Sequence, residues 1–329
     1  MIYKISNQFI NFIFVDNKGI NINGLKKYLG NYINVEEYKE NNLPNDTLII
    51  IINDKNKLIY NSNLGIIDDH IFALKNNELC IYVDDNPKEI IFIKRLLCDL
   101  SNRLFEQKKG IFLHGASVID NDHSIVLIGN KGTGKTTNML NLLEKYNLGY
   151  SSNERTGIIN FDGKLMSYGN LARINIRPKT LGDNESLKFK LMDCIDKEKY
   201  LEYSKLDLPM DCSERLVVTF DDISKKLDVP IVPTSNLYSI CNLIYNPNIN
   251  FEMEKIDYIN IKKYLMDASI DGVFSQRQIL NDILPINKIN YDDLFNNSVN
   301  YYNIYQNNTC GNSDKIIKIL RRDYNNGRR

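Results

Sequence analysis

The stretch that decides the fold is Gly129-Asn130-Lys131-Gly132-Thr133-Gly134-Lys135-Thr136-Thr137. It fits the pattern G-x-x-x-x-G-K-[ST] and lies between a short apolar run, 125–128, and a segment with helical periodicity, 135–146. Glycines let successive backbone N–H groups turn inward, and the start of a helix adds partial positive charge. The pattern therefore predicts a phosphate-binding loop at the junction of a strand and a helix.

Two side chains of this loop have defined roles in such a motif. Lys135 would reach the β- and γ-phosphates of a nucleotide, and the hydroxyl of Thr136 would hold Mg²⁺. The candidate nucleotide contacts are Gly129, Asn130, Lys131, Gly132, Thr133, Gly134, Lys135, Thr136 and Thr137. ATP, or another nucleoside triphosphate, together with Mg²⁺ is the expected ligand.

A phosphate-binding loop does not specify a reaction, so an acidic group must come from elsewhere. Glu154 and Arg155 follow the strand expected over 148–152. In a parallel β-α-β unit the end of that strand lies at the same sheet edge as the loop, within reach of a metal held by Thr136. Asp221 and Asp222 are the competing acids, after the expected strand 216–220. We favour a helix-capping role for them, because helical spacing follows at once.

A histidine precedes the loop in the run Leu113-His114-Gly115-Ala116-Ser117-Val118. This run belongs to the strand expected over 111–118, which would pair beside the strand that enters the loop. A lone histidine in a strand is usually structural, but the neighbouring Gly115 permits close approach of a ligand. Both roles of His114 stay open, whereas His70 and His123 are expected at the surface.

Composition places the chain among folded proteins and excludes several classes of partner. Its 329 residues correspond to about two domains at roughly 150 residues each. Lys and Arg number 41, as do Asp and Glu, so no overall field selects nucleic acid or an acidic membrane. Six scattered cysteines show no metal-binding spacing and are expected to be reduced thiols. With no apolar run long enough for a signal or membrane helix, the expected location is the cytoplasm.

The pattern along the chain predicts two domains. In the first, residues 1–108, short apolar runs indicate strands, and a helix begins near Pro87 and ends before Gly110. The expected strands are 9–15, 48–52, 57–60, 71–74 and 79–83. In the second, residues 109–329, a hairpin turns at 121–124, an apolar segment spans 237–245, and helices dominate past 255. The tail 321–329 is expected to be frayed.

Three stretches together resemble the HPr kinase-like branch of the phosphoenolpyruvate-carboxykinase-type P-loop fold. They are the run that contains His114, the phosphate-binding loop, and Tyr150-Ser151-Ser152-Asn153-Glu154-Arg155. The resemblance covers residues 111–180 and includes the segment 169–177. It implies an α/β fold, with a mixed-sheet P-loop core and a smaller N-terminal α+β domain. It also puts Lys135 and Thr136 on nucleotide and Mg²⁺, makes His114 a neighbour of the phosphates, and makes Glu154 the catalytic, metal-linked acid.

The sequence departs from this family at two points. The Asp-Asp pair of HPr kinases is replaced by Asn153-Glu154, so one carboxylate is lost. The later Glu-x-Arg-Gly signature of the bifunctional kinase/phosphorylases has no counterpart. These departures count against phosphorolysis and against HPr as the substrate.

The leading hypothesis is an ATP-dependent kinase that phosphorylates a serine or threonine hydroxyl of a peptide or protein, with Glu154, Lys135 and His114 as its catalytic residues. Arg155, Arg173 and Arg177 would bind phosphate or an acidic substrate group, or serve in structural ion pairs. One alternative is a kinase of a small hydroxylated metabolite such as free serine. Another is a nucleotide-binding regulatory module without catalysis. Residues 1–108 would recognise the acceptor or form a packing or oligomerisation module, which leaves a homo-oligomer open.

Overall fold

The computed structural model describes residues 1–329 except 21, 30–31, 41–46, 55–63, 68–69, 76–77, 85–86, 170–173, 205–214, 271–283, 285–289, 296–298, 309–311 and 327–329. The chain divides into two compact units. Unit 1 is Met1–Gly110 with Asp271–Lys288, and unit 2 is Ile111–Ile270 with Ile289–Arg329. This division differs from the expected domains, 1–108 and 109–329, because it counts Asp271–Lys288 with unit 1.

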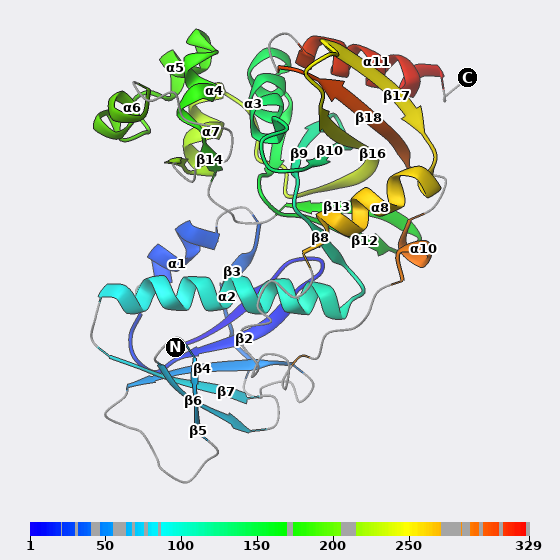
Figure 1. Ribbon diagram of the computed structural model, residues 1–329. Helices are drawn as coiled ribbons and strands as arrows, with labels where there is room; N and C mark the ends of the chain where they lie inside the picture. The colour runs from blue at the N-terminus through cyan, green and yellow to red at the C-terminus, as the bar shows by residue number, and fades with distance from the viewer. Residues whose placement is uncertain are drawn as a thin grey trace. The chain divides into compact units, whose positions relative to one another are not determined.

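Unit 1 is built on a mixed seven-stranded sheet in the order β3-β1-β2-β4-β7-β6-β5 (Figure 1). Its strands are β1 (Ile2–Ser6), β2 (Asn11–Asp16), β3 (Asn34–Glu37), β4 (Ile49–Asp54), β5 (Leu64–Ile67), β6 (His70–Lys75) and β7 (Glu78–Val83). β2, β4 and β7 are parallel. The helices are α1 (Ile22–Leu29) and α2 (Pro87–Gln107). Phe105 of α2 packs edge-to-face on Phe9, with ring centroids 5.4 Å apart.

The long apolar runs of unit 1 form strands as expected. The runs 9–15, 48–52, 71–74 and 79–83 lie in β2, β4, β6 and β7, and the expected helix is α2. The run 57–60 lies outside the described residues. The sequence did not predict β3, whose burial pattern has only Val35 buried and so gives no alternation to detect.

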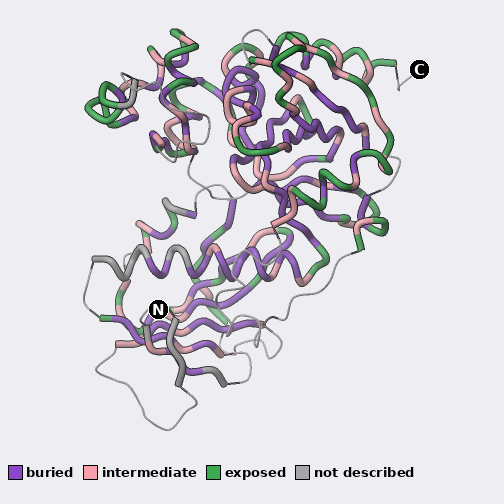
Figure 2. Tube along the Cα trace, in the orientation of Figure 1, coloured by how far each residue is buried: buried purple, intermediate pink, exposed green. Residues whose placement is uncertain are grey.

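Unit 2 is centred on a nine-stranded mixed sheet. Its main path is β11-β9-β10-β16-β13-β12-β8, with β18 paired to β16 and β17 to β18. The strands are β8 (Ile111–Leu113), β9 (Ala116–Asp120), β10 (His123–Gly129), β11 (Gly149–Ser152), β12 (Thr156–Phe161), β13 (Lys164–Gly169), β16 (Thr234–Tyr245), β17 (Phe251–Ile256) and β18 (Asn300–Gln306). Figure 2 traces much of the central strands as buried, and Val126, Leu127 and Ile128 of β10 are fully so.

Several helices pack against the strands of this sheet. α3 (Lys135–Tyr146) contacts β9 and β10 as well as α11 (Asn312–Asn326). α8 (Tyr258–Ala268) contributes Ile261 and Leu265 to a core cluster with Val126 and Ile128 of β10. The short α10 (Tyr291–Leu294) adds Leu294 to the same cluster. The fold of unit 2 is therefore a mixed α/β arrangement around one sheet.

The expected single strand over 111–118 is two strands, which is a correction to the prediction. β8 pairs with β12 at one end of the sheet path, whereas β9 pairs with β10 and β11 near the other end. Only His114 and Gly115 separate them, so the Cα atoms of Leu113 and Ala116 lie at most about 11 Å apart. The path must therefore curl back toward its own beginning, and His114 stands where its two ends meet. The apolar pattern continues across the break, which is why it suggested one strand.

A small module is inserted between β13 and β16. It contains the two-stranded sheet of β14 (Ile174–Ile176) and β15 (Leu216–Val218), and the helices α4 (Pro178–Gly182), α5 (Glu185–Leu191), α6 (Lys197–Ser204) and α7 (Phe220–Leu227). The expected strand 216–220 thus ends at Val218 and lies in this separate sheet. Thr219, and not Asp221 or Asp222, is the N-cap residue of α7. Asp222 completes a capping box, because its carboxylate accepts from the hydroxyl and N–H of Thr219, whereas Asp221 only lies in the first turn.

The described region past 255 is mainly helical, as expected, with α8, α10 and α11, but the sequence did not predict β18, which runs parallel to β16. One other expectation about unit 2 was wrong. The tail was expected to be frayed from Arg321, but α11 continues to Asn326. Arg321 forms a two-point ion pair with Asp120, with N–O distances of 2.7 and 3.0 Å. Long-range pairing of this kind leaves no local signal in the sequence.

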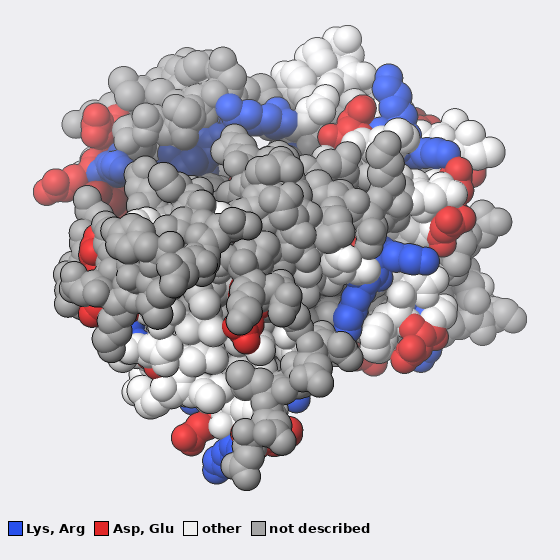
Figure 3. All heavy atoms as spheres, turned by 90° about the horizontal axis from the view of Figure 1, so that it is seen from below, with Lys and Arg blue, Asp and Glu red and all other residues white. Residues whose placement is uncertain are grey.

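Acidic and basic side chains are equal in number in the sequence, and both kinds occur on the surface. On the face drawn in Figure 3, acidic and basic side chains are interspersed over the residues shown in colour. No helix in the described part of the chain combines the length and apolar composition that crossing a membrane requires.

Candidate functional site

The loop between β10 and α3 depends on glycine at three positions. The backbone φ is 134° at Gly129 and 93° at both Gly132 and Gly134, in the region that other residues rarely adopt. A Cβ atom at Gly129 would lie 2.4 Å from the carbonyl oxygen of Leu243 in β16. Only glycine therefore fits where the loop leaves the sheet, and the loop turns at once into the first turn of α3.

Lys135 is the first residue of α3, and its amine bonds to the loop itself. Nζ donates to the carbonyl oxygens of Gly129 and Asn130, at 2.6 and 3.1 Å. Burial lowers the pKa of Lys135 to about 8, while the charge of Glu154 raises it and that of Arg177 lowers it further. An arriving phosphate would take the place of the carbonyl groups and favour the charged amine.

Thr136 bonds to the end of β11. Its hydroxyl donates to Oδ1 of Asn153 at 3.1 Å. Asn153 is 1% exposed, and its Nδ2 has no hydrogen-bond partner among the described residues. β11 runs in the same direction as β10, because both pair antiparallel with β9 between them. The expected β-α-β geometry thus brings the strand end to the loop, but it sets the neutral amide of Asn153, not Glu154, against the hydroxyl of Thr136.

Glu154 and His114 lie together beside the loop. Nδ1 of His114 is 3.0 Å from the backbone oxygen of Glu154 and 3.7 Å from its carboxylate. A carbonyl oxygen only accepts, so Nδ1 carries the proton, and Nε2 of the neutral ring is then an acceptor. Glu154 holds a left-handed φ of 72°, a conformation that costs a residue other than glycine about 1–2 kcal/mol. This backbone turn presents both the carbonyl and the carboxylate of Glu154 to the imidazole.

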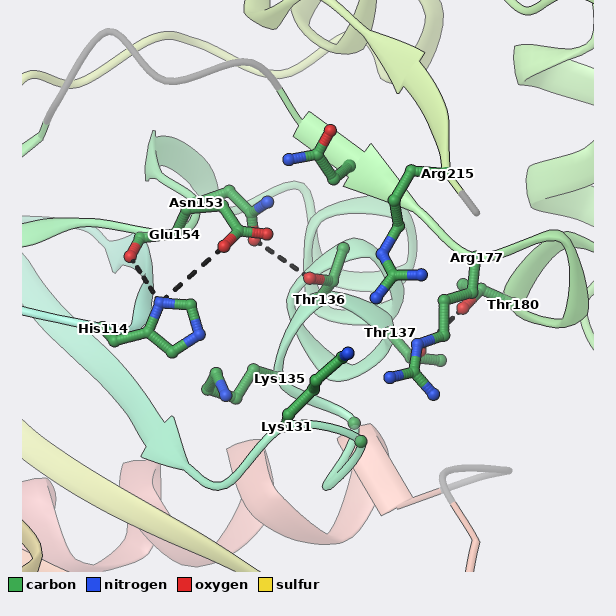
Figure 4. Close-up of a pocket in the computed structure, with 13 residues that line it drawn as sticks. His114, Lys131, Lys135, Thr136, Thr137, Asn153, Glu154, Arg177, Thr180 and Arg215 are labelled. Atoms are coloured by element: carbon green, nitrogen blue, oxygen red, sulfur yellow. Dashed lines mark hydrogen bonds and ion pairs between the residues drawn. The ribbon is translucent and has the colours of Figure 1, made fainter. Parts of the chain in front are cut away.

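These groups line one pocket of about 350 Å³ in unit 2 (Figure 4). Its described lining residues are His114, Lys131, Gly132, Gly134, Lys135, Thr136, Thr137, Asn153, Glu154, Asn175, Arg177, Thr180 and Arg215. Glu154 and His114 lie on one side of the pocket, and Arg177 and Arg215 of the inserted module lie on the other. Lys131, Lys135 and Thr136 lie between them in this view. The pocket is therefore formed by a glycine-rich loop with an acid on one flank and two guanidinium groups on the other.

The inserted module is joined to α3 by polar contacts. The hydroxyls of Thr137 and Thr180 are 3.0 Å apart, and Asn184 donates to Asn141 at 2.8 Å. Farther along α3, Glu144 accepts from Ser186 and pairs with Lys190. Residues 137, 141 and 144 lie on one face of a helix, so a single face of α3 holds the module.

Buried amide side chains form a hydrogen-bond network with the backbone of the loop between β10 and α3. Gln306, at the end of β18, donates from Nε2 to the carbonyl oxygen of Thr133 at 2.7 Å. Asn312 of α11 donates to Oε1 of Gln306 at 3.0 Å, and Asn138 of α3 donates to the carbonyl oxygen of Gly134 at 3.2 Å. Asn138, Gln306 and Asn312 are each at most 2% exposed. The backbone of the loop is thus tied to two helices and a distant strand.

The sequence-based set of site residues and the pocket overlap in part. Gly129, Asn130 and Thr133 belong to the loop but do not line the pocket, and Arg155 is also absent from the described lining. Arg173 lies outside the described residues. His123 packs on the rings of Tyr238 and Tyr324, with centroids 5.8 and 4.5 Å away, in a second pocket.

Sequence reasoning missed Asn175, Thr180 and Arg215 as pocket residues, and Asn138, Gln306 and Asn312 as supports. Asn138 gave a detectable signal, because it is a polar residue four positions before Leu142 on the buried face of α3. Arg215 gave none, because the inserted module alone brings it to the loop.

Comparison with known proteins adds little to this geometry. No family model and no curated protein matches the chain. Among solved structures, the HPr(Ser) kinase/phosphatase from Coxiella burnetii is similar over 65% of this chain and 95% of its own, with 9% sequence identity and a TM-score of 0.32.

The pocket offers the type of ligand that Mg²⁺ prefers. The hydroxyl of Thr136, the amide oxygen of Asn153 and the carboxylate of Glu154 are hard oxygen donors in one cavity. Among the described residues, no three His, Cys, Asp or Glu side chains gather as a metal centre. The donor set fits a cation that shares its coordination with phosphate oxygens and water.

Proposed function

We propose that this protein is an ATP-dependent kinase that phosphorylates the hydroxyl of serine or threonine in a peptide or protein. The observation that carries the proposal is the convergence in one pocket of the Lys135–Thr136 loop with the Glu154–His114 pair. Phosphoryl transfer needs positioned charge more than covalent chemistry, and this pocket supplies both a phosphate cradle and a carboxylate beside it.

The residues of the pocket divide the work of transfer between them. The loop N–H groups and the amine of Lys135 hold the β- and γ-phosphates. Glu154 accepts the proton of the attacking hydroxyl, whose oxygen bonds to the γ-phosphorus as the bond to the β-γ bridging oxygen breaks and ADP leaves. His114 positions Glu154 through its bond to the backbone carbonyl. Mg²⁺, held by Thr136 with Asn153 and Glu154 nearby, would neutralise charge on the phosphates when bound.

Two variants test this division. Lys135→Ala is expected to abolish turnover because the phosphates lose their cation. Glu154→Gln is expected to bind ATP as the wild type does and to lose transfer by on the order of 10²–10⁴-fold. The measurement is transfer from γ-labelled ATP to pools of serine and threonine peptides and, separately, of small hydroxylated metabolites. Full activity of Glu154→Gln would contradict the role of Glu154, and labelling of the metabolite pool alone would replace the peptide acceptor with a small molecule.

One observation favours a second candidate, a nucleotide-binding module without catalysis. Asn153, a neutral amide, bonds to Thr136 at the position where a carboxylate would help to hold the metal. ATP binding with no transfer to any acceptor pool would support this candidate over the kinase.

A further inference from the structure

One face of the two-stranded sheet of the inserted module carries Asn175, Arg177 and Arg215, which line the pocket, together with Val217, which is exposed and does not line it. Ile174 and Ile176 of β14, together with Leu216 and Val218 of β15, are at most 1% exposed. Because side chains alternate along a strand, Asn175 and Arg177 point the other way, and both line the pocket. The antiparallel register pairs Ile176 with Leu216, so Arg177 and Arg215 are neighbours where the two strands meet the pocket.

The position of Glu154 on the other flank of the pocket determines in which direction a bound nucleotide would lie. This step rests on the proposed function, which puts the reacting γ-phosphate next to Glu154. The β-phosphate would then lie at Lys135 and Thr136, and the nucleoside must leave the loop on the side away from Glu154. That side is the wall formed by Asn175, Arg177 and Arg215, with Thr137 and Thr180 bonded at its base.

The side chains of this wall suit a nucleoside. Guanidinium groups stack on the faces of bases and pair with phosphate, and an asparagine amide can donate to and accept from a base edge at once. Arg177 is also close enough to Lys135 to act on the charge of its amine, which places Arg177 within range of the polyphosphate.

We infer that Asn175, Arg177 and Arg215 form the nucleoside subsite of the donor, with Arg177 toward the α-phosphate and Arg215 and Asn175 toward the base. The polyphosphate and the nucleoside are then held by different parts of the chain: the loop holds one, and the inserted module holds the other. The donor class is a nucleoside triphosphate rather than an inorganic polyphosphate.

Binding measurements can separate the two parts without any acceptor. Dissociation constants for ATP and for inorganic tripolyphosphate, each with Mg²⁺, are measured by calorimetry on the full-length protein and its variants. Arg215→Ala and Asn175→Ala are expected to weaken ATP binding, Arg215→Ala by roughly tenfold or more, and to leave tripolyphosphate within about twofold of wild type. Retained tripolyphosphate affinity also shows that the loop is still folded in each variant.

Two control variants frame the result. Lys131→Ala removes a cation from the loop and is expected to weaken ATP and tripolyphosphate by the same factor. Arg322→Ala removes an exposed arginine of α11 that pairs with Asp323, and is expected to change neither.

The inference is overturned if Arg215→Ala and Asn175→Ala leave ATP affinity unchanged, or if they weaken both ligands equally. Failure of the wild type to bind either ligand would overturn the phosphate loop itself, and the kinase proposal with it. Failure of phosphoryl transfer alone would count against the kinase proposal only, since the affinity ratio is measured without transfer.

Discussion

Lys135 is largely buried in its own loop, and this burial would make the proposed nucleotide binding depend on pH. Its pKa is lowered to about 8, mainly by burial, and a bound phosphate would raise it. Below pH 8 the amine is already charged. Above it, binding must take up a proton, so ATP affinity is expected to fall by roughly tenfold per pH unit until the pKa of the complex is reached.

Calorimetry between pH 7.5 and 9.5, in two buffers of different ionisation enthalpy, measures this proton uptake. Lys135→Arg serves as the control, because its guanidinium stays charged over the whole range and its ATP affinity should not change with pH. Equal proton uptake by the wild type and Lys135→Arg would assign the titration to another group.

Asn153 allows a second test at the level of a single residue. Asn153→Asp would put a carboxylate in a site that is 1% exposed, beside the hydroxyl of Thr136. Without a cation nearby, such a charge is costly, so the free energy of unfolding of the nucleotide-free variant is expected to fall by about 1–3 kcal/mol. Mg²⁺–ATP should restore it, which gives a larger rise in Tm than in wild type. Thermal unfolding with and without Mg²⁺–ATP measures both effects, and an equal rise in the two proteins would place the metal away from residue 153.

The positions of some site residues could be predicted from the sequence because the geometry they need is local. The glycines, Lys135 and Thr136 lie within one loop, and the geometry they need is encoded in consecutive residues. The proximity of Glu154 to the loop followed from a single topological rule about strand ends. The contact of Asn153 with Thr136 could not be predicted in the same way. The left-handed φ of Glu154 turns the backbone at the strand end, and such a turn changes which of two neighbouring side chains faces the loop.

At the scale of elements, β18 and α11 support the loop through Gln306. Gln306→Leu would leave the carbonyl oxygen of Thr133 and the amide of Asn312 without this partner in a buried site. We expect a loss of about 1–3 kcal/mol in the free energy of unfolding, with weaker ATP binding because the loop is less fixed. Urea unfolding and ATP titration measure the two effects.

Asn307→Ala is a matched control for Gln306→Leu. Asn307 is the residue after Gln306, and its side chain donates to Asn250 at the surface. The substitution should therefore change stability little and ATP affinity not at all. If Gln306→Leu lowered stability but left ATP affinity unchanged, the network would support the fold alone.

Elements with strong periodicity were predicted from the sequence, and elements defined by distant pairing were not. The expected helix 135–146 matches α3, because a glycine-rich start and the period of its buried residues mark both ends. β8 and β9 merged in the prediction because both are apolar and only two residues separate them. β14 is three residues long, too short for a period to show, and it pairs with β15, the start of the expected strand 216–220.

At the scale of the whole molecule, the described residues of the candidate site all belong to unit 2. Hydrogen exchange with and without Mg²⁺–ATP is therefore expected to show protection in the loop, α3 and the module strands. The strands of unit 1 should exchange at unchanged rates. Protection of β1, β2 or β4 on ATP addition would show that the two units are energetically coupled, and would favour a role of unit 1 in the reaction.

The central strands of the unit 2 sheet are far apart in the sequence, and this separation affects how the chain folds. β10 pairs with β16 in a register that begins with His123 and Asn236. The chain between these strands, which includes the whole inserted module, must therefore be synthesised and must form a closed loop before the centre of the sheet exists. Closure of such a loop costs entropy before any pairing returns free energy, so refolding in milliseconds to seconds or slower is expected. Until β16 arrives, β10 and β13 each present an unpaired edge. Association of these edges between chains is then the reaction that competes with folding, and refolding yield should fall as protein concentration rises.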